Sequence, residues 1–264
     1  MKNKRLIILL SIFAFLTIVV ILCSTIFTLR SVTFSWKCTK VHLSEYTDEQ
    51  IAKSVDLGDS IFLLNKNKMA EKLEITYPYI KVIKIETKFP NKVVVHATER
   101  DSVYAVTLGD GRYAVIDDEN KVLEHCTQDE LDNWDENISV KPIVANVNVN
   151  GDLFNLSEKD FPLGYVADVR RVTTLLRDIA YTLKTYGYPQ NYLLKGFASK
   201  LDVNIAYQSN VLISTYFGLK IEIKDCYQSL SAKVQLGFSV YEAQRDANVT
   251  TGIIVVEGKQ AYIE

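Results

Sequence analysis

The chain opens with one uninterrupted apolar run and then changes to shorter, alternating patterns. Residues 6–29 contain no charged side chain and follow Lys2, Lys4 and Arg5. A helix rises 1.5 Å per residue, so this run spans about 36 Å, enough to cross a hydrocarbon core of about 30 Å. The pattern predicts an uncleaved transmembrane helix over residues 6–29, preceded by a short cytoplasmic tail over residues 1–5.

Two other interpretations of this run remain open. A cleaved signal peptide has a shorter apolar core, of about 7–15 residues, and ends in small residues. Cys23-Ser24-Thr25 matches such a cleavage site poorly. A buried core helix is the third possibility. Because basic residues precede the run, the favoured topology is single-pass type II in the plasma membrane, with the N-terminus in the cytoplasm.

The next block, residues 31–100, predicts a β-α-α-β-β unit. A strand is expected over residues 32–43, followed by a helix that starts at Thr47 with a capping box to Gln50 and by a second helix over residues 65–76. A hairpin follows, turning at Pro90-Asn91. Period-2 alternation predicts that its two strands each bury one face. The side chains expected on that face are Ile83, Ile85, Thr87, Phe89, Val93, Val95 and Ala97.

The remaining block, residues 101–264, predicts a mixed or antiparallel β domain with flanking helices, so the fold class is α+β. Three strands joined by tight turns are expected within residues 103–125, and further strands over residues 200–207, 210–215, 219–225, 252–257 and 260–264. Two amphipathic helices are predicted from apolar residues recurring at three and four. Their stripes are Val169, Val172, Leu176, Ile179 and Leu183, ending by Gly187 and Pro189, and Leu230, Val234, Phe238 and Tyr241.

The charge balance of the part beyond residue 30 is acidic. The first 30 positions hold four of the 30 basic residues, which leaves 26 against 32 acidic residues and a formal charge of −6. Such a domain has no electrostatic reason to bind nucleic acid or to lie flat on an anionic bilayer.

Candidate chemistry is sparse. Glu99-Arg100 could be a catalytic pair, but is better interpreted as ending a strand and bracing one domain against the next. Asp117-Asp118-Glu119 lacks the spaced oxygens of a calcium loop and is expected to be a solvated turn. Cys38 and His42 lie four apart on a predicted strand, without a second ligand pair. No nucleophile elbow, zinc or phosphate-loop motif is present, and the cysteines outside the span allow one disulfide at most. We therefore expect no catalytic residue, cofactor or metal site.

Several stretches in order resemble the FtsQ/DivIB cell-division proteins, whose extracytoplasmic part begins with a POTRA domain. They are "YTDEQIAKSVDLGDSIFLLN", "YPYIKVIKIETKFPNKVVVHATER", "GRYAVIDDENKVL" and the C-terminal "GLKIEI…SAKVQLGF…TGIIVV". The chain departs from the family pattern at Asp101, at Asn120, where Gly is usual, and in its short cytoplasmic tail. The resemblance implies a POTRA domain over residues 31–100 and an FtsQ/DivIB-type β domain over residues 101–264.

The resemblance also implies a non-enzymatic role. Members of the family are bitopic scaffolds at the division septum. They bind FtsB/DivIC-type and FtsL-type coiled-coil division proteins and help to control septal peptidoglycan synthesis. A terminal sheet edge is a ready site for strand addition by a partner, and the family uses that edge. By position, the partner-binding candidates are Val255, Val256, Glu257, Gly258 and Tyr262.

Three alternatives stay open. A POTRA-containing chaperone of secretion or outer-membrane assembly would use the same kind of domain, but such proteins usually carry several POTRA units or a membrane barrel. A membrane-anchored cell-wall enzyme would need catalytic residues that no motif reveals. A sensor ectodomain would need more than five cytoplasmic residues for signal output.

Overall fold

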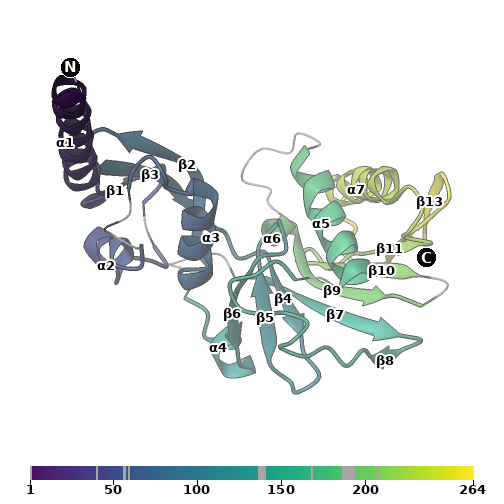
Figure 1. The fold of residues 1–264 in the computed structure, drawn as a ribbon. Helices are drawn as coiled ribbons and strands as arrows, with labels where there is room; N and C mark the ends of the chain where they lie inside the picture. Colours follow the sequence, from purple (N-terminus) through teal and green to yellow (C-terminus); the bar gives the residue numbers. More distant parts are fainter. Residues whose placement is uncertain are drawn as a thin grey trace. The chain divides into compact units, whose positions relative to one another are not determined.

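The chain divides into two compact units, Met1–Glu99 and Arg100–Glu264, which Figure 1 colours from purple to blue and from teal to yellow. The computed structural model describes residues 2–39, 41–55, 58, 60–135, 141–167, 169–185, 194–206 and 209–264. Each unit has its own β-sheet. Helices and strands are not sorted into alternating βαβ repeats, so the α+β class is confirmed.

The first unit has the predicted β-α-α-β-β order behind an N-terminal helix. Its sheet has the order β1-β3-β2, with β1 parallel and β2 antiparallel to the central β3. The first strand ends at residue 36 and not at residue 43 as predicted. The elements are α1 (Lys2–Ile26), β1 (Ser31–Trp36), α2 (Asp48–Ala52), α3 (Lys66–Thr76), β2 (Ile80–Lys88) and β3 (Lys92–Glu99).

The capping box at the start of α2 is confirmed. The Gln50 amide donates to the Thr47 hydroxyl at 3.2 Å, and the Thr47 amide donates to the Gln50 side chain at 2.7 Å. These two bonds satisfy donors that the first turn of a helix leaves unpaired. Ile51 then lies fully buried on the sheet side of the helix.

The predicted buried face of the hairpin is only partly correct. Ile85, Val93, Val95 and Ala97 are buried, whereas Ile83 and Phe89 are exposed. A register shift between Val82 and Lys84 explains the first difference, because an extra residue in one strand reverses the alternation locally. Phe89 lies beyond the end of β2, in the turn, so the strand alternation does not apply to it.

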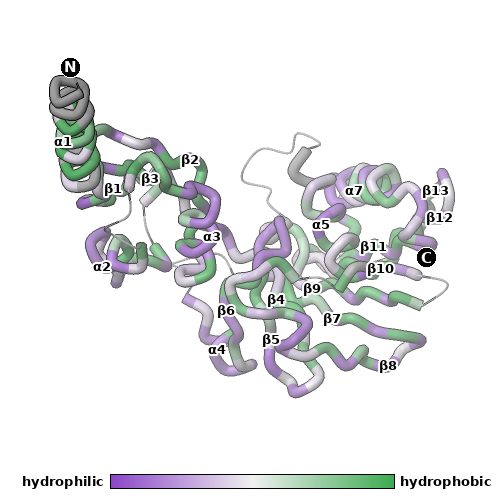
Figure 2. The backbone as a smooth tube through the Cα atoms, viewed as in Figure 1, coloured by the Kyte–Doolittle hydropathy of each residue, from purple (hydrophilic) through white to green (hydrophobic). Residues whose placement is uncertain are grey.

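Helix α1 is mostly apolar beyond its first turns, and green predominates in the part that Figure 2 colours. Large side chains on it are exposed, among them Phe13, Phe15 and Val20. Within the part of the chain that the structure describes, no helix reaches the combination of length and hydropathy that crossing a membrane requires. The predicted anchor over residues 6–29 thus stays a prediction.

The second unit is built on one mixed sheet, with ten strands among the described residues and the path β13-β12-β11-β10-β9-β7-β4-β5-β6, with β8 beside β7. The pairs β4–β7, β7–β9 and β11–β12 are parallel. The strands are β4 (Tyr104–Thr107), β5 (Tyr113–Ile116), β6 (Val122–Cys126), β7 (Ile143–Val149), β8 (Asp152–Leu153), β9 (Ala198–Asn204), β10 (Asn210–Thr215), β11 (Lys220–Lys224), β12 (Ile253–Glu257) and β13 (Gln260–Ile263).

The helices α5 (Arg170–Thr185) and α7 (Leu230–Asp246) pack side by side over one face of this sheet (Figure 1). They bury the predicted residues Val172, Leu176 and Ile179 and the whole predicted stripe of α7. At Gly237 an added Cβ would lie 2.8 Å from Ile221 Cγ2. Glycine therefore lets α7 approach β11 and β12 closely.

Several elements of the second unit were not predicted: β7, β8, α4 (Gln128–Asp132) and α6 (Leu194–Phe197). The strand β7 is central, since it lies between β4 and β9. Asn120 has φ 63, so it adopts the left-handed conformation that glycine would adopt most easily.

Part of the prediction for α5 lies outside the described residues: the Leu183 side chain and the end of the helix at Gly187 and Pro189.

Candidate partner-binding edge of the second unit

The C-terminal hairpin forms one end of the sheet. Its strands β12 and β13 are joined by Gly258 and Lys259, because Glu257 pairs directly with Gln260. Gly258 has φ 60. A positive φ at the first position of a two-residue loop gives the twist that antiparallel strands need. The turn thus fixes the register of β13 on β12.

The hairpin places the five candidate residues in different environments. Val255 and Val256 are fully buried, and β12 is paired on both sides, parallel to β11 and antiparallel to β13. Glu257 and Gly258 are exposed, and 41% of Tyr262 is accessible. The two valines therefore support the edge from inside the sheet, and the accessible candidates lie in the turn and on β13.

The strand β13 has an open backbone. Within the described chain it is paired with β12 alone. Ile253 and Glu264 exchange both of their backbone hydrogen bonds, at 3.0 and 2.9 Å. Such exchange occurs at every second pair of an antiparallel ladder. By this alternation the N–H and C=O groups of Ala261 and Ile263 are directed away from β12. They are available to a further strand.

The opposite end of the sheet is covered where β6 begins. At β6, the Val122 amide donates to the Tyr165 carbonyl at 2.9 Å, and the Gly164 amide donates to the Val122 carbonyl at 3.0 Å. Lys121 also forms a bridge with Val166. A loop that pairs with an edge strand blocks the addition of another strand. The two edge strands thus differ: β6 pairs with a loop where it begins, whereas the outer side of β13 has no strand or loop paired with it among the described residues.

The side chains of β13 alternate between two surfaces. Ala261 packs against the core beneath α7, and Ile263, on the same face, is 42% exposed. Tyr262 lies on the other face, opposite Val255. There Tyr262, followed by Glu257 and Glu222, raises the pKa of the Lys224 ammonium. The edge presents one aromatic ring, one aliphatic side chain and one cation around the open backbone groups.

The sheet face that carries Tyr262 has a row of polar side chains at its middle strands. Thr107 donates to Asn146 at 2.7 Å, and Asn146 donates to Asp202 at 2.9 Å. In register, the same row continues through Leu212, Glu222 and Val255 to Tyr262. At the far end, α4 covers this face, and its Leu131 is buried beside Tyr113 and Trp134. These bonds order the face that adjoins the open edge.

The predicted turn Asp117-Asp118-Glu119 is not fully solvated. Asp117 is 2% exposed and accepts a hydrogen bond from Arg100 at 2.6 Å, while Glu119 accepts from the same nitrogen at 2.8 Å. Burial raises the pKa of the Asp117 carboxyl, and Arg100 opposes this rise. The solvated-turn prediction is wrong for Asp117, because the guanidinium compensates its charge within the fold.

The Glu99 carboxylate has its partners in the first unit. It accepts hydrogen bonds from the Val41 and Leu43 amides at 2.7 and 2.8 Å.

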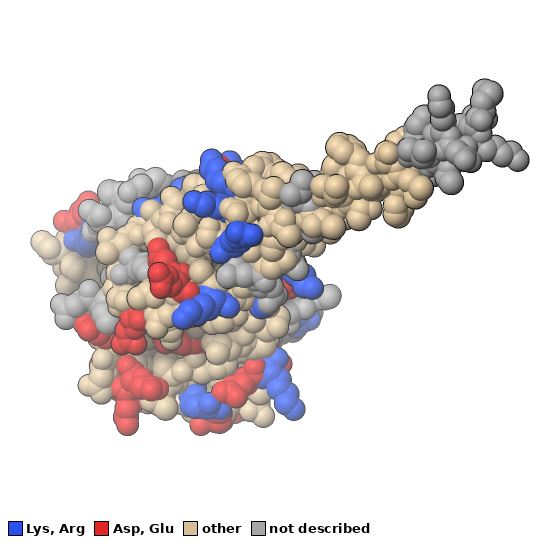
Figure 3. Space-filling model, turned by 60° about the vertical axis from the view of Figure 1, so that its left-hand side comes forward, with Lys and Arg blue, Asp and Glu red and all other residues tan. Residues whose placement is uncertain are grey.

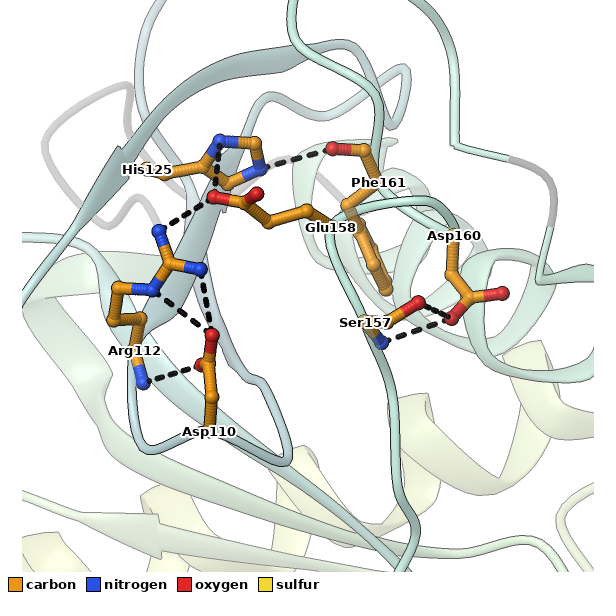
Figure 4. A network of polar contacts seen from close by, with 7 residues as sticks. All are labelled: Asp110, Arg112, His125, Ser157, Glu158, Asp160 and Phe161. Atoms are coloured by element: carbon orange, nitrogen blue, oxygen red, sulfur yellow. Dashed lines mark hydrogen bonds and ion pairs between the residues drawn. The ribbon is translucent and has the colours of Figure 1, made fainter.

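Figure 4 shows a polar network between the β4–β5 turn, β6 and the segment after β8. Arg112 binds Asp110 at 2.6 Å and Glu158 at 2.5 Å. His125 Nε2 lies 2.9 Å from the Phe161 carbonyl oxygen. The Ser157 hydroxyl donates to Asp160 at 2.7 Å, so this network does not pair a serine with a histidine base as nucleophilic catalysis requires. These contacts hold the segment after β8 against the β4–β5 turn and β6.

The cysteine and histidine candidates do not form a ligand cluster. Cys38 lies beyond the end of β1, 3.2 Å from the Thr98 hydroxyl, and His42 stacks on Tyr79 at 4.0 Å. Cys38, Cys126 and Cys226 are free thiols. Across the described residues, no group of three or more potential metal ligands is brought together.

Comparison with known proteins finds a family match that lies almost wholly within the first unit. Residues 41–100 match the family described as "POTRA domain, FtsQ-type". The chain is also 36% identical over 78 residues to the cell division protein DivIB of Clostridium tetani (strain Massachusetts / E88). That similarity covers 29% of this chain and 29% of the relative.

Proposed function

We propose, from the premise that this chain belongs to the FtsQ/DivIB family through its FtsQ-type POTRA domain, that it is a scaffold of the bacterial division machinery. In this proposal the chain is a bitopic protein of the plasma membrane at the division septum. It has a cytoplasmic N-terminus, a POTRA domain over residues 31–100 and a β domain over residues 101–264. Its role is to gather other division proteins and so to help regulate septal peptidoglycan synthesis.

The anchor is proposed from the charge-free run of residues 6–29 behind three basic residues. Exposed apolar side chains along α1, such as Leu10 at 60% and Phe13 at 69%, favour a lipid surrounding over water. In Figure 3 the described part of this helix carries no blue or red side chain. A bilayer would cover this surface.

The observation that carries the scaffold proposal is the open edge of β13, at the end of a sheet whose other edge strand, β6, is paired with a loop where it begins. We infer that an extended segment of a partner adds to this edge as a further strand. The partners proposed are the extracytoplasmic parts of FtsB/DivIC-type and FtsL-type coiled-coil proteins. Tyr262 and Ile263 would contact the partner with their side chains. Glu257 and Gly258 would form the rim of the interface, and Val255 and Val256 would support it from inside the sheet.

The test is binding of the full chain to the extracytoplasmic parts of its own coiled-coil partners. Ile263→Pro removes an outward amide donor without breaking the ladder to β12. Because one hydrogen bond contributes about 1 kcal/mol, the loss alone predicts binding weaker by roughly fivefold to tenfold. Ile263→Val keeps the donor and the β-branched shape, so it should bind as the unaltered chain does.

Equal affinity of the folded Ile263→Pro and Ile263→Val variants would move the interface away from this edge. A chain that binds none of these partners would remove the proposed mechanism altogether. The chaperone alternative uses strand addition at the POTRA sheet. There the exposed β2 edge carries a bulge and the exposed Lys84 and Lys88, which are features that hinder strand addition.

A further inference from the structure

A cluster of apolar side chains lies at the end of α1: half-buried Phe27 and exposed Phe62, Leu63 and Phe89, which we call the aromatic cap. The ring centroids of Phe27 and Phe62 are 4.9 Å apart, and those of Phe62 and Phe89 are 5.4 Å apart. Phe62 and Phe89 are each 61% exposed, and Leu63 is 84% exposed. The predicted strand pattern placed Phe89 in the core, so this cluster was not foreseen.

Backbone hydrogen bonds fix the cap to the exit of the helix. The Ile61 amide donates to the Phe27 carbonyl at 2.8 Å, and Thr28 forms a bridge with Ser60. The Arg30 amide donates to the Asn91 carbonyl at 2.9 Å, next to the turn that carries Phe89. Both segments that supply the cap are therefore held at the point where α1 ends.

The core of the first unit does not need these rings. Leu29 and Ile61, which neighbour them in sequence, are the residues that turn inward and are buried. The cap instead continues the exposed apolar surface of α1, which reaches Ile26 at 45% exposure. A contiguous apolar patch costs free energy in water and indicates a surface that something covers.

The basic residues near the cap segments in the sequence favour a lipid surface as what covers the cap. Arg30, Lys66 and Lys92 are exposed, and each lies within a few residues of a cap segment, while Asp56 and Asp59 precede the 60–63 segment in the sequence. Apolar and aromatic side chains beside basic residues are typical of segments that enter the boundary between lipid headgroups and acyl chains. Phosphate groups would meet the cations while the rings enter the acyl region.

We propose that the aromatic cap inserts into the interface of the bilayer that α1 enters, on the side of the folded domain. This inference rests on the proposed membrane anchor. It adds a second contact beside the helix, formed by the 60–63 loop and the 89–91 turn. Two contacts with the bilayer restrain the orientation of the first unit more than the helix alone does. A transmembrane helix of a partner is the other occupant that this surface could take.

The test uses three tryptophan reporters in the full chain, reconstituted in vesicles of phosphatidylethanolamine and phosphatidylglycerol with brominated acyl chains. Leu63→Trp reports on the cap, and Phe15→Trp on the middle of α1. Tyr46→Trp is the matched control. Tyr46 contacts Tyr77 edge to face, with ring centroids 5.3 Å apart, beside the start of β2 and so at the end of the sheet away from α1. The emission of Trp36 and Trp134 is subtracted with the unaltered chain.

We expect bromine near the headgroups to quench the tryptophan fluorescence of Leu63→Trp. The fluorescence of Phe15→Trp should also be quenched by brominated lipid, and that of Tyr46→Trp should be unaffected. Quenching of Phe15→Trp alone would overturn the cap proposal and leave the anchor intact, with the cap free for a partner helix. Quenching of all three reporters would overturn it in favour of a domain that lies flat. If none is quenched, the proposed anchor fails together with the cap.

Discussion

Arg100 is a cation that the second unit holds below its surface, with only 6% of its side chain exposed. It faces Asp117, whose other oxygen accepts the Glu119 and Lys121 amides at 2.9 and 2.7 Å. Removing one partner of a buried pair leaves an uncompensated charge and costs about 3–5 kcal/mol. We expect Arg100→Met to lower the free energy of unfolding by about that amount at neutral pH in urea titrations.

The pH dependence of this loss identifies its cause. Burial already raises the pKa of Asp117, and Arg100 limits the rise. In Arg100→Met the folded-state pKa of Asp117 rises further above its unfolded value, so protonation stabilises the folded state and the deficit shrinks as the pH falls. Arg112→Met is the control, because its side chain is 41% exposed and such pairs contribute about 0–1 kcal/mol. A deficit that is constant with pH would contradict the assignment to Asp117.

At the scale of elements, the contact of α7 with the sheet depends on Gly237. A Cβ there would lie 2.8 Å from Ile221 Cγ2 and 3.0 Å from Val256 Cγ2, closer than packed atoms tolerate. Alanine gains up to about 1 kcal/mol in helix propensity, but overpacking a core costs about 1–3 kcal/mol. Since both methyl groups belong to buried β-branched side chains, the clash outweighs the gain. We predict that Gly237→Ala lowers the thermal midpoint, whereas Ser239→Ala, on the exposed side of α7, leaves it nearly unchanged.

Elements with local signals could be predicted from the sequence, and elements defined by distant partners could not. The capping box at Thr47 and the stripe of α7 depend on neighbours three or four residues away, and both are present. The strand β7 has the alternation of a half-buried strand, but Asn146 on its open face is stabilised by Thr107 and Asp202 from other strands. Its central place in the sheet is set by those pairings.

The candidate site shows the same division. That the last two strands lie at one end of the sheet agrees with their terminal position in the sequence, and the binding site proposed there stays a prediction. Which strand is the edge could not be predicted, because that depends on the pairing of β12 with both β11 and β13. The aromatic cap was missed for a related reason. Phe62 and Phe89 are far apart in sequence, and the backbone bonds of the 60–63 loop to residues 27 and 28 bring them together.

At the scale of the whole molecule, the proposals depend on which side of a membrane the two units occupy. Cys38 can report this, because it is an exposed thiol in the first unit, beyond the end of α1. The other thiols outside α1 are protected: Cys126 and Cys226 are buried, and burial raises the pKa of the Cys126 thiol to about 12. Only thiolates react readily, so labelling of the folded units should be confined to Cys38.

The topology prediction follows from this difference in reactivity. An impermeant maleimide should label the chain in right-side-out membrane vesicles, and peptide mapping should place the label on Cys38. Inside-out vesicles should stay unlabelled until they are opened with detergent. Cys38→Ser should abolish the signal in both preparations. The opposite pattern would place both units in the cytoplasm, where neither the β13 edge nor the aromatic cap could meet extracytoplasmic partners or the outer leaflet, and the scaffold proposal would fail with it.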